Sequence, residues 1–357
     1  MASKKRPTQG DVARVAGVSR ATVSFVLNNT GAGAISVSPE TRQKVVEAAR
    51  QLNYLPDPVA QMLASGSNHL IGVFTYEPDF PFERTDFYYD FLLGIETGAA
   101  RSDLDVILFT RAGEPDRPRL IYGPAGNRLR LADGAIFLGA NPDRAELARL
   151  TDEGYPFVFI GRRDVPGREI SWVTIDYASA SAQATRHLLE AGHRDIAYVG
   201  SDTNAESNQD KLIGIRDAVR DVADARIHIL SEAVLGDAVA YAAALREAFC
   251  SAVLCSHATT FDITLDALES VGLRVPAEIS VISLADTTRV VGGGRVHTHV
   301  NVDRRAWGEQ AVRSLVRMIR EETTEPIQVR MPYTFVVGET TAPRQTCRNV
   351  FRGQKAR

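Results

Sequence analysis

The stretch that most constrains the fold is residues 8–28, TQGDVARVAGVSRATVSFVLN. Its pattern predicts two short helices, Gln9–Ala16 and Arg20–Leu27. Gly17 would form the corner, because glycine tolerates the backbone angles of a tight turn, and Ser19 is a good N-cap for the second helix. The small apolar residues that the crossed helices would bury are Val12, Ala13, Ala16, Val23, Val26 and Leu27. An ordinary helical hairpin has the same local pattern, but the layout is that of a helix-turn-helix, whose second helix enters the DNA major groove.

Charge separates this segment from the rest of the chain. The net charge is −3, but residues 1–65 hold eight Lys and Arg residues against four Asp and Glu residues. That segment is therefore +4, and the remainder is −3 minus 4, or −7. A basic head on an acidic body is typical of a polyanion-binding module joined to domains that do not bind nucleic acid.

A third helix is predicted from Ser38 onward. Ser38 is a good N-cap, and Pro39 suits the first helical position. Val45, Ala49 and Leu52 then recur at helical spacing, so that face would pack back on the first two helices. The three helices together would form a small headpiece.

A fourth, shorter helix is predicted after the headpiece. Asp57 can cap it and Pro58 can open it. A helix of only about two turns is marginal in water. We therefore expect this segment to be helical only when something supports it.

Length and composition indicate a multidomain globular protein. A chain of 357 residues with 44% hydrophobic and 24% charged residues is too long for one small core. The start, MASKKRPTQG, does not resemble a signal peptide, and no apolar stretch is long enough to span a membrane. Cys250, Cys255 and Cys347 form no CxxC pair, which favours reduced thiols over a disulfide framework. We expect a cytoplasmic protein without membrane association.

Beyond the short helix, the pattern changes to alternating strands and helices. The strand candidates are short runs rich in Val, Ile and Phe, which suit parallel sheets buried on both faces. They lie at 70–74, 106–110, 135–138, 157–160, 172–175, 196–199, 252–254, 279–284 and 299–302. Helical patterns separate most of them, so a doubly wound α/β architecture is predicted.

Three motifs, in the expected order and spacing, resemble the start of a LacI/GalR-type transcriptional regulator. They are DVARVAGVSRATVSFVLN, VSPETRQKVVEAARQLNYLPD and VAQMLASGSNHLIGV. Later phrases, among them ADGAIFLG and HLLEAGHRDIAYVG, resemble the periplasmic-binding-protein-like body of that family. The resemblance implies a sequence-specific regulator, a repressor more readily than an activator. It would bind a near-palindromic double-stranded operator as a homodimer and respond to a small molecule.

The same resemblance implies the fold class and the domains. The expected fold is an N-terminal all-α helix-turn-helix headpiece plus an α/β core of two doubly wound parallel-sheet subdomains. The expected domains are a headpiece (1–56), a hinge helix and linker (57–68), an effector-binding and dimerisation core (69–345) and a basic tail (346–357). Subdomain 1 would take about 69–170 and 302–329 and subdomain 2 about 171–301 and 330–345, with crossings near residues 170, 302 and 330.

Position in the first motif implies the DNA contacts. Short polar side chains would bind phosphates, namely Thr8, Ser19, Thr22, Ser24 and Asn28. Arg20, Ala21 and Phe25 would face base edges, where Arg20 can donate two hydrogen bonds to guanine, worth roughly 1–3 kcal/mol. Family members often carry a polar or basic residue in place of Phe25, so the operator sequence stays open, and Phe25 could instead pack in the core. Leu63 of the hinge would be wedged into the minor groove or pack against its dimer mate.

Effector contacts are implied between the two subdomains. The matching positions are Tyr76, Phe87, Tyr88, Arg111, Asp176, Lys211, His257, Ala285 and the neighbouring Asp286. Phe87 and Tyr88 could stack on a flat or sugar-like ring, or pack in the core.

Three of these positions depart from the pattern of sugar-binding members. Lys211 stands where an arginine is common, His257-Ala258 where Asn-Asp is common, and Ala285 where an aspartate is common. Lysine lacks the planar two-pronged donor of arginine, and the lost carboxylates remove acceptors for sugar hydroxyls. An ordinary sugar is therefore a weaker expectation for the effector of this chain than for other family members, and the ligand could be chemically different.

Two other classes of protein were weighed. An enzyme is disfavoured because the chain has no HExxH, GxSxG, P-loop or GxGxxG motif, and no cofactor is expected. His297 and His299 could ligate a metal, but no cysteine or carboxylate cluster accompanies them. A solute-binding protein with the same core but no regulatory role is the alternative, and the headpiece argues against it.

Overall fold

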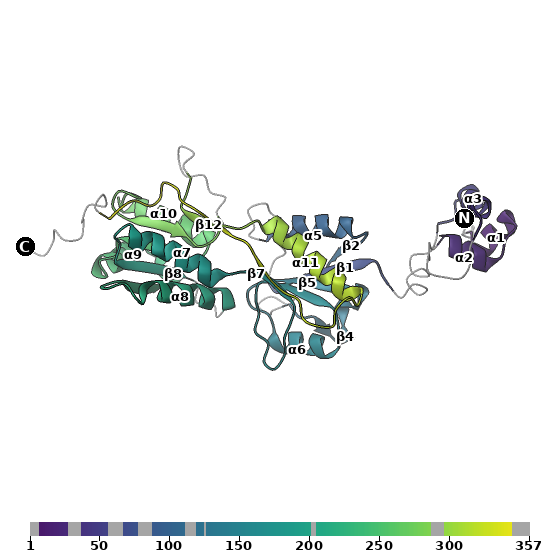
Figure 1. Ribbon diagram of the computed structural model, residues 1–357, viewed down its shortest axis with the longest axis horizontal. Helices are drawn as coiled ribbons and strands as arrows, with labels where there is room; N and C mark the ends of the chain where they lie inside the picture. The colour runs from purple at the N-terminus through teal and green to yellow at the C-terminus, as the bar shows by residue number, and fades with distance from the viewer. Residues whose placement is uncertain are drawn as a thin grey trace, which may run out of the picture. The chain divides into compact units, whose positions relative to one another are not determined.

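The computed structural model describes residues 7–27, 37–55, 67–77, 88–110, 119–124, 126–200, 205–286 and 296–344. It divides into two compact units, Met1–His69 and Leu70–Arg357 (Figure 1). No helix among the described residues is long and apolar enough to cross a membrane.

The N-terminal unit contains three helices, α1 (Gln9–Ala16), α2 (Arg20–Leu27) and α3 (Pro39–Gln51). Thr8 and Asp11 begin α1 with a reciprocal capping box, and Gly17 ends it in the left-handed conformation at φ 67°. The buried side chains form one small core, namely Val12, Ala13, Val23, Val26, Val45, Ala48 and Ala49. The predicted bounds of α1 and α2 are confirmed, as is the packing of α3 against them.

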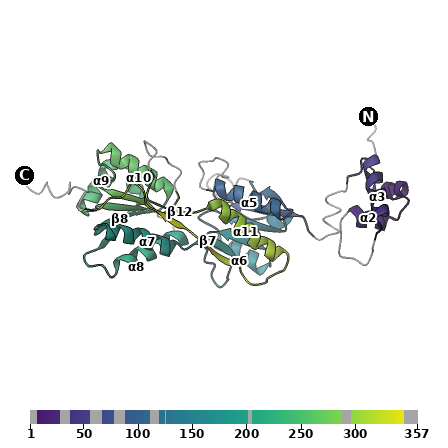
Figure 2. The same ribbon diagram turned by 45° about the horizontal axis from the view of Figure 1, so that its top comes forward.

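The first half of the larger unit is built around a parallel sheet with the strand order β13-β7-β6-β5-β1-β2. Its strands are β1 (Leu70–Thr75), β2 (Asp105–Leu108), β5 (Gly134–Leu138), β6 (Phe157–Ile160), β7 (Trp172–Ile175) and β13 (Gln328–Met331). Its helices are α5 (Tyr89–Arg101), α6 (Arg144–Asp152) and α11 (Arg304–Ile319), and a small excursion holds β3 (Tyr122–Gly123), β4 (Gly126–Asn127) and the 3-10 turn η1 (Arg128–Leu131). Helices α5 and α11 pack side by side over this sheet (Figures 1 and 2).

The second half is built around a sheet with the order β14-β12-β11-β10-β8-β9, parallel except for β14. Its strands are β8 (Asp195–Gly200), β9 (Arg226–Ser231), β10 (Ala252–Cys255), β11 (Ser280–Ser283), β12 (His299–Asn301) and β14 (Thr334–Val336). Its helices are α7 (Tyr177–Glu190), α8 (Glu206–Val219), α9 (Ala238–Glu247) and α10 (Ala258–Ser270), with the 3-10 turn η2 (Glu232–Gly236).

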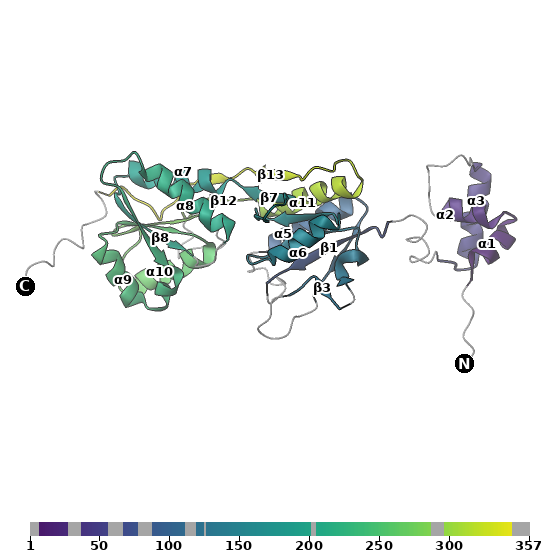
Figure 3. The same ribbon diagram turned by 90° about the horizontal axis from the view of Figure 1, so that it is seen from below.

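Both sheets are covered on both faces, and side-chain alternation along the strands shows it. On β8, Ile196 and Tyr198 pack in one hydrophobic cluster with α7 and α8, whereas Ala197 and Val199 pack in another with α9 and α10. Figure 3 shows the two helix pairs on opposite sides of the strands. This arrangement is the doubly wound α/β architecture that the sequence predicts.

The structure corrects the predicted crossings between the halves. β7 belongs to the first sheet, so the first crossing follows Ile175 instead of lying near residue 170. The second crossing follows β12, close to the predicted residue 302, and the third lies between β13 and β14, at Pro332 and Tyr333. Below, the half containing β1 is called subdomain 1 and the half containing β8 is called subdomain 2.

Candidate functional site

The exposed face of α2 is the first candidate site. Arg20 and Ala21 are exposed, while Ser24 and Phe25 are partly exposed. Phe25 does not belong to the hydrophobic cluster of the headpiece, so the alternative of core packing is not what the structure shows. The α2 face therefore presents one guanidinium, small groups and an aromatic ring.

The short polar residues around α2 hold the helix-turn-helix in shape. Ser19 accepts a hydrogen bond from the backbone N–H of Thr22 at 3.0 Å, and the two hydroxyls lie 2.9 Å apart. The Thr8 hydroxyl donates to Asp11 at 2.8 Å. Their predicted roles as phosphate contacts stay predictions, and Asn28 and Leu63 lie outside the described residues.

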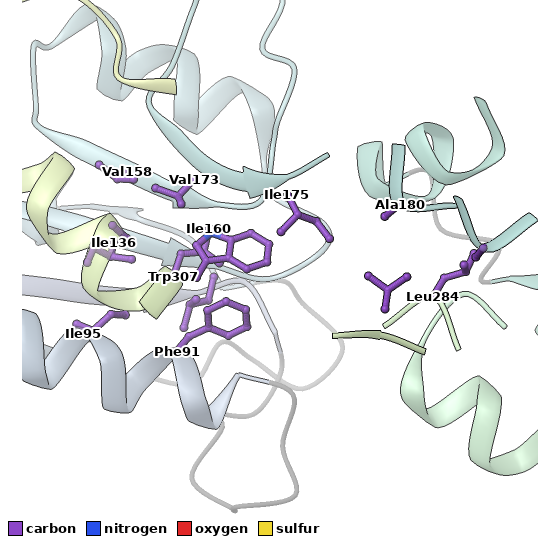
Figure 4. Close-up of a cluster of buried hydrophobic side chains, with 14 of the residues drawn as sticks. Phe91, Ile95, Ile136, Val158, Ile160, Val173, Ile175, Ala180, Leu284 and Trp307 are labelled. Atoms are coloured by element: carbon purple, nitrogen blue, oxygen red, sulfur yellow. The ribbon is translucent and has the colours of Figure 1, made fainter. Parts of the chain in front are cut away.

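The second candidate site is a cavity of about 580 Å³ between the two subdomains. It is lined from subdomain 1 by residues that follow strands, such as Glu77 after β1 and Ala140 after β5, and from subdomain 2 by His257 after β10 and Asp286 after β11. The carboxyl ends of both parallel sheets thus face the cavity, which is where this architecture binds ligands. Phe91 of α5 and Trp307 of α11 meet edge-to-face at 5.1 Å and add an apolar wall (Figure 4).

Lys211 is the cation of subdomain 2 in this cavity, and close packing of α8 on α7 fixes its position. At Gly214 a Cβ atom would lie 1.9 Å from the Ala178 carbonyl oxygen, so only glycine permits this approach. The Ser181 hydroxyl donates to the Lys211 carbonyl at 2.8 Å and pins the same turn of α8. The Lys211 side chain, 2% exposed, then reaches toward the start of α10.

The Lys211 ammonium has few partners for a buried charge. Nζ donates to the Ser256 carbonyl at 2.7 Å and lies 4.9 Å from the centre of the Tyr177 ring. Burial lowers the pKa of Lys211 to about 7, because the low-dielectric surroundings disfavour the charged form. The positive charge of Lys211, and after it burial, lowers the pKa of the neighbouring His257 to about 3.

Two arginines, Arg163 and Arg304, add positive charge to the lining from subdomain 1. Arg304 donates to the Asp286 carbonyl at 2.9 Å and lies 3.8 Å from the carboxylate of the same residue. Arg163 donates to the Gly139 carbonyl at 2.6 Å and lies over the Phe159 ring at 4.5 Å. Both guanidiniums are therefore held by protein groups, and both side chains are almost fully buried.

Ion pairs join the two subdomains beside the cavity. Arg162, in the loop after β6, binds Asp210 of α8 through two hydrogen bonds of 2.9 and 3.2 Å. Glu206, at the start of α8 and 1% exposed, accepts from the Asp164 backbone N–H at 2.9 Å and pairs with Arg144 of α6 at 2.8 Å. One end of α8 is thereby fastened to subdomain 1.

Four of the predicted effector-contacting residues line the cavity, namely Tyr88, Lys211, His257 and Asp286. Ala285, where sugar-binding members commonly have an aspartate, also lines it. Tyr76 does not line it: the ring is buried against Phe74 and Phe137 on the other face of the first sheet. Asp176 does not line it either, because the carboxylate caps α7 through the N–H and hydroxyl of Ser179. Phe87 and Arg111 lie outside the described residues.

The sequence reasoning missed several lining residues. They include Arg163, Tyr177, Glu232, Arg304 and Trp307. Arg163 could have been found, since it comes shortly after a predicted strand whose carboxyl end had to face the cavity. The histidine pair lies in different surroundings: His297 packs on Phe261, and His299 is 3.9 Å from Asp286. Among the described residues, no group of three or more potential metal ligands occurs.

Comparison with known proteins agrees with both candidate sites. The family model of bacterial regulatory proteins of the lacI family matches residues 8–57, and the periplasmic binding protein-like domain matches residues 185–341. These features define a class of protein in which a helix-turn-helix headpiece is joined to a two-subdomain ligand-binding core.

Relatives extend the match over nearly the whole chain. The HTH-type transcriptional regulator CelR of Thermobifida fusca is 29% identical over 348 residues, covering 95% of this chain and 100% of CelR. Catabolite control protein A of Staphylococcus xylosus is 29% identical over 340 residues, covering 93% of this chain and 98% of that protein. Both family models and both relatives support assignment of the chain to the LacI/GalR family of transcriptional regulators. Both relatives are transcriptional regulators and not enzymes.

Solved structures agree on the fold. The CelR–cellobiose complex is 28% identical with a TM-score of 0.62, covering 94% of this chain and all of that one. The Lac repressor dimer bound to operator and the anti-inducer ONPF has a TM-score of 0.72 over 95% of this chain and 100% of that one. At 24% identity, that second likeness supports the fold alone.

Proposed function

We propose that this protein is a repressor that binds a near-palindromic operator as a homodimer, with an affinity set by a small molecule in the cavity between subdomains 1 and 2. The main support for DNA binding is the exposed face of α2, where the Arg20 side chain lies outside the hydrophobic core of the headpiece. The relatives that cover nearly all of the chain are regulators, and one of them forms a complex with cellobiose.

The proposed DNA contacts follow from the α2 face. Arg20 and Ala21 face base edges, and Phe25 offers an apolar contact, for instance to a thymine methyl group. The short polar residues around the turn position the headpiece on phosphates. Two such headpieces related by two-fold symmetry would explain a near-palindromic operator.

The proposed response to a ligand follows from the cavity and the ion pairs beside it. A ligand changes DNA affinity only if it binds one arrangement of the subdomains better than another. Because α8 supplies both Lys211 to the cavity and Asp210 to the pair with Arg162, a ligand there acts on the contact between subdomains. The hinge predicted at residues 57–68 would carry that change to the headpieces.

The test of the DNA contact is a mobility-shift titration of the full chain against operator and random duplex. Arg20→Ala should lose roughly 1–3 kcal/mol of affinity for operator and much less for random duplex, because a base contact carries specificity. Arg50→Ala is the matched control, since it removes an exposed guanidinium of the same headpiece from α3. Equal losses for both variants would mean that Arg20 contributes charge alone. A chain that prefers no operator-like site, or sediments as a monomer, would overturn the proposed function.

A further inference from the structure

The start of α10 forms part of the cavity wall and lacks the usual cap. The N-cap residue His257 makes no side-chain hydrogen bond to the helix, and the first turn contains no acidic residue. In the same unit, α6, α7, α9 and α11 each begin with an aspartate whose carboxylate accepts from a first-turn N–H, whereas α5 and α8, like α10, have no side-chain cap. The first turn of α10 therefore supplies no negative group itself, and the carboxylate beside it, that of Glu232 in η2, accepts from the Thr260 hydroxyl at 3.4 Å and not from a backbone N–H.

The first backbone N–H groups of α10 are available at the cavity. Ala258, Thr259 and Thr260 all line it. Their N–H groups find no acceptor among the described residues, whereas the next one, that of Phe261, donates to the His257 carbonyl at 3.0 Å. Unsatisfied donors at a helix N-terminus are suited to an anion, because the N–H groups and the helix dipole favour negative charge together.

Lys211 adds a buried amino group, positively charged when protonated, to the same place. Its Nζ donates to Ser256, the residue immediately before the α10 N-cap. No carboxylate lies within ion-pair distance of Nζ in the described part of the chain. A buried ammonium with one carbonyl partner and no counterion is costly, unless a ligand supplies the missing negative charge.

The acidic residues of the cavity do not serve as that counterion. Glu77 accepts from the Ala140 backbone N–H at 2.8 Å, and Glu232 accepts from the Thr260 hydroxyl at 3.4 Å. Asp286 lies beside Arg304 and His299. Asp90 belongs to the first turn of α5, in subdomain 1.

We propose that the ligand of this cavity carries an anionic group, a carboxylate or a phosphate, which binds between Lys211 Nζ and the backbone N–H groups at the start of α10. This inference rests on the proposed function, in that it names the chemical class of the molecule in the cavity. A cavity of about 580 Å³ leaves room for a small organic anion beside this group.

Calorimetric titration of the full-length chain tests the proposal with four probes. Inorganic phosphate and glucose 6-phosphate carry the phosphate group, and glucuronate carries the carboxylate. Glucose is the neutral counterpart of glucose 6-phosphate and of glucuronate. Moderate salt, about 0.15 M, screens weak binding to exposed charges. At least one anion should bind saturably, with one site per chain and at least tenfold tighter than glucose. Which anion binds distinguishes a carboxylate ligand from a phosphate ligand.

Substitutions then assign the site. Lys211→Met should weaken anion binding by roughly 10- to 100-fold, as expected for the loss of a charge-assisted hydrogen bond. Lys211→Arg should retain most of it. Lys44→Met removes a lysine of the N-terminal unit, with a side chain that is 59% exposed, and should change nothing. Repeating the wild-type titration of glucuronate, whose carboxylate stays ionised near neutral pH, in buffers of different ionisation enthalpy should show proton uptake, and Lys211→Arg should show none.

Three results would overturn the inference. They are glucose binding as tightly as the anions, an unchanged anion affinity in Lys211→Met, and no saturable binding of any of the three anions at millimolar concentration. Operator binding is measured separately by mobility shift. A chain that binds operator but no anion refutes this inference alone, whereas a chain that binds no operator refutes the proposed function.

Discussion

The buried Lys211 should make the protein less stable near neutral pH than it would be with an uncharged side chain of similar length. Burial lowers the pKa of Lys211 from its ordinary value of 10.5 to about 7. Between those two pH values the unfolded chain binds more protons than the folded chain, so the free energy of unfolding rises with pH across that window. Below pH 7 the destabilisation is fully present, and above pH 10.5 it is gone.

The magnitude follows from the difference between the two pKa values. That difference is about 3.5, and each pKa unit corresponds to about 1.4 kcal/mol, so the full destabilisation is about 5 kcal/mol. At pH 7 the folded lysine is about half neutral, which reduces the destabilisation to on the order of 4 kcal/mol. Lys211→Met keeps most of the side-chain volume and removes the charge. It also leaves the Ser256 carbonyl without its donor, which costs about 1–3 kcal/mol. The variant should therefore be more stable than the wild type at pH 7 by about 2 kcal/mol.

Urea denaturation at pH 7 and pH 9.5, followed by circular dichroism, measures the effect. The advantage of Lys211→Met should shrink at the higher pH, because the unfolded wild-type chain gains less free energy from protonating Lys211 as the pH approaches 10.5. Lys44→Met should show no such pH-dependent gain, since its exposed side chain is not desolvated. An advantage that is absent at pH 7, or equal at both pH values, would refute the reasoning.

The same variant gives a second, acid-side signature. The charge of Lys211 is the largest cause that holds the pKa of His257 at about 3. A histidine with a lowered pKa makes stability fall as the pH drops from about 6.5 toward 3, because the unfolded chain takes up the proton first. Without the Lys211 charge the pKa of His257 should rise, so Lys211→Met should lose less stability over that acid range than the wild type.

Two further substitutions test the hinge and the contact between subdomains. Leu63→Ala should keep ligand binding in calorimetry and lose most operator affinity in a mobility-shift assay, since a minor-groove wedge acts only on DNA; unchanged operator affinity would count against the hinge prediction. Asp210→Asn should lower the free energy of unfolding by about 1 kcal/mol and increase the radius of gyration in small-angle scattering, because it removes a partly exposed ion pair that joins subdomains 1 and 2. Asp217→Asn is the matched control, because Asp217 pairs with Arg220 next to the same helix and should leave the radius of gyration unchanged.

Local signals made the headpiece predictable. A capping threonine or serine, a glycine at the corner and a spaced set of small apolar residues fix α1 and α2 without reference to the rest of the chain. Most parallel strands were predictable for a similar reason, since a strand buried on both faces is apolar throughout, as in FVFI of β6.

The strands that were missed lie at edges or carry few apolar residues. β9, RIHILS, is an edge strand that includes the polar residues Arg226 and His228, and none of its residues is buried. β13 and β14 are short and partly exposed, and Pro332 separates them. Their pairing depends on the chain passing twice between the sheets, which no local pattern contains.

The site was harder to predict than the fold, because a change of one residue in position decides whether a side chain faces the cavity. Tyr76 follows β1 directly, yet side-chain alternation sends its ring to the Phe74 face and away from the cavity. Asp176 follows β7, but its carboxylate is used as a helix cap. Lys211, which the family resemblance implies as an effector contact, lies in the cavity lining, and Gly214 allows the close approach of α8 to α7 that orients that turn.

Helix α8 is the element through which a ligand and the arrangement of subdomains 1 and 2 can affect each other. Lys211 faces the cavity, and the residue before it, Asp210, holds Arg162 of subdomain 1. One turn earlier, Glu206 holds Arg144. Because an α-helix is stiff over so short a length, a shift of Lys211 toward a bound anion moves both ion pairs as well. The ligand then stabilises whichever arrangement of the subdomains lets α8 satisfy Lys211, Asp210 and Glu206 together, and only that difference in binding free energy can alter the grip of the headpieces on DNA.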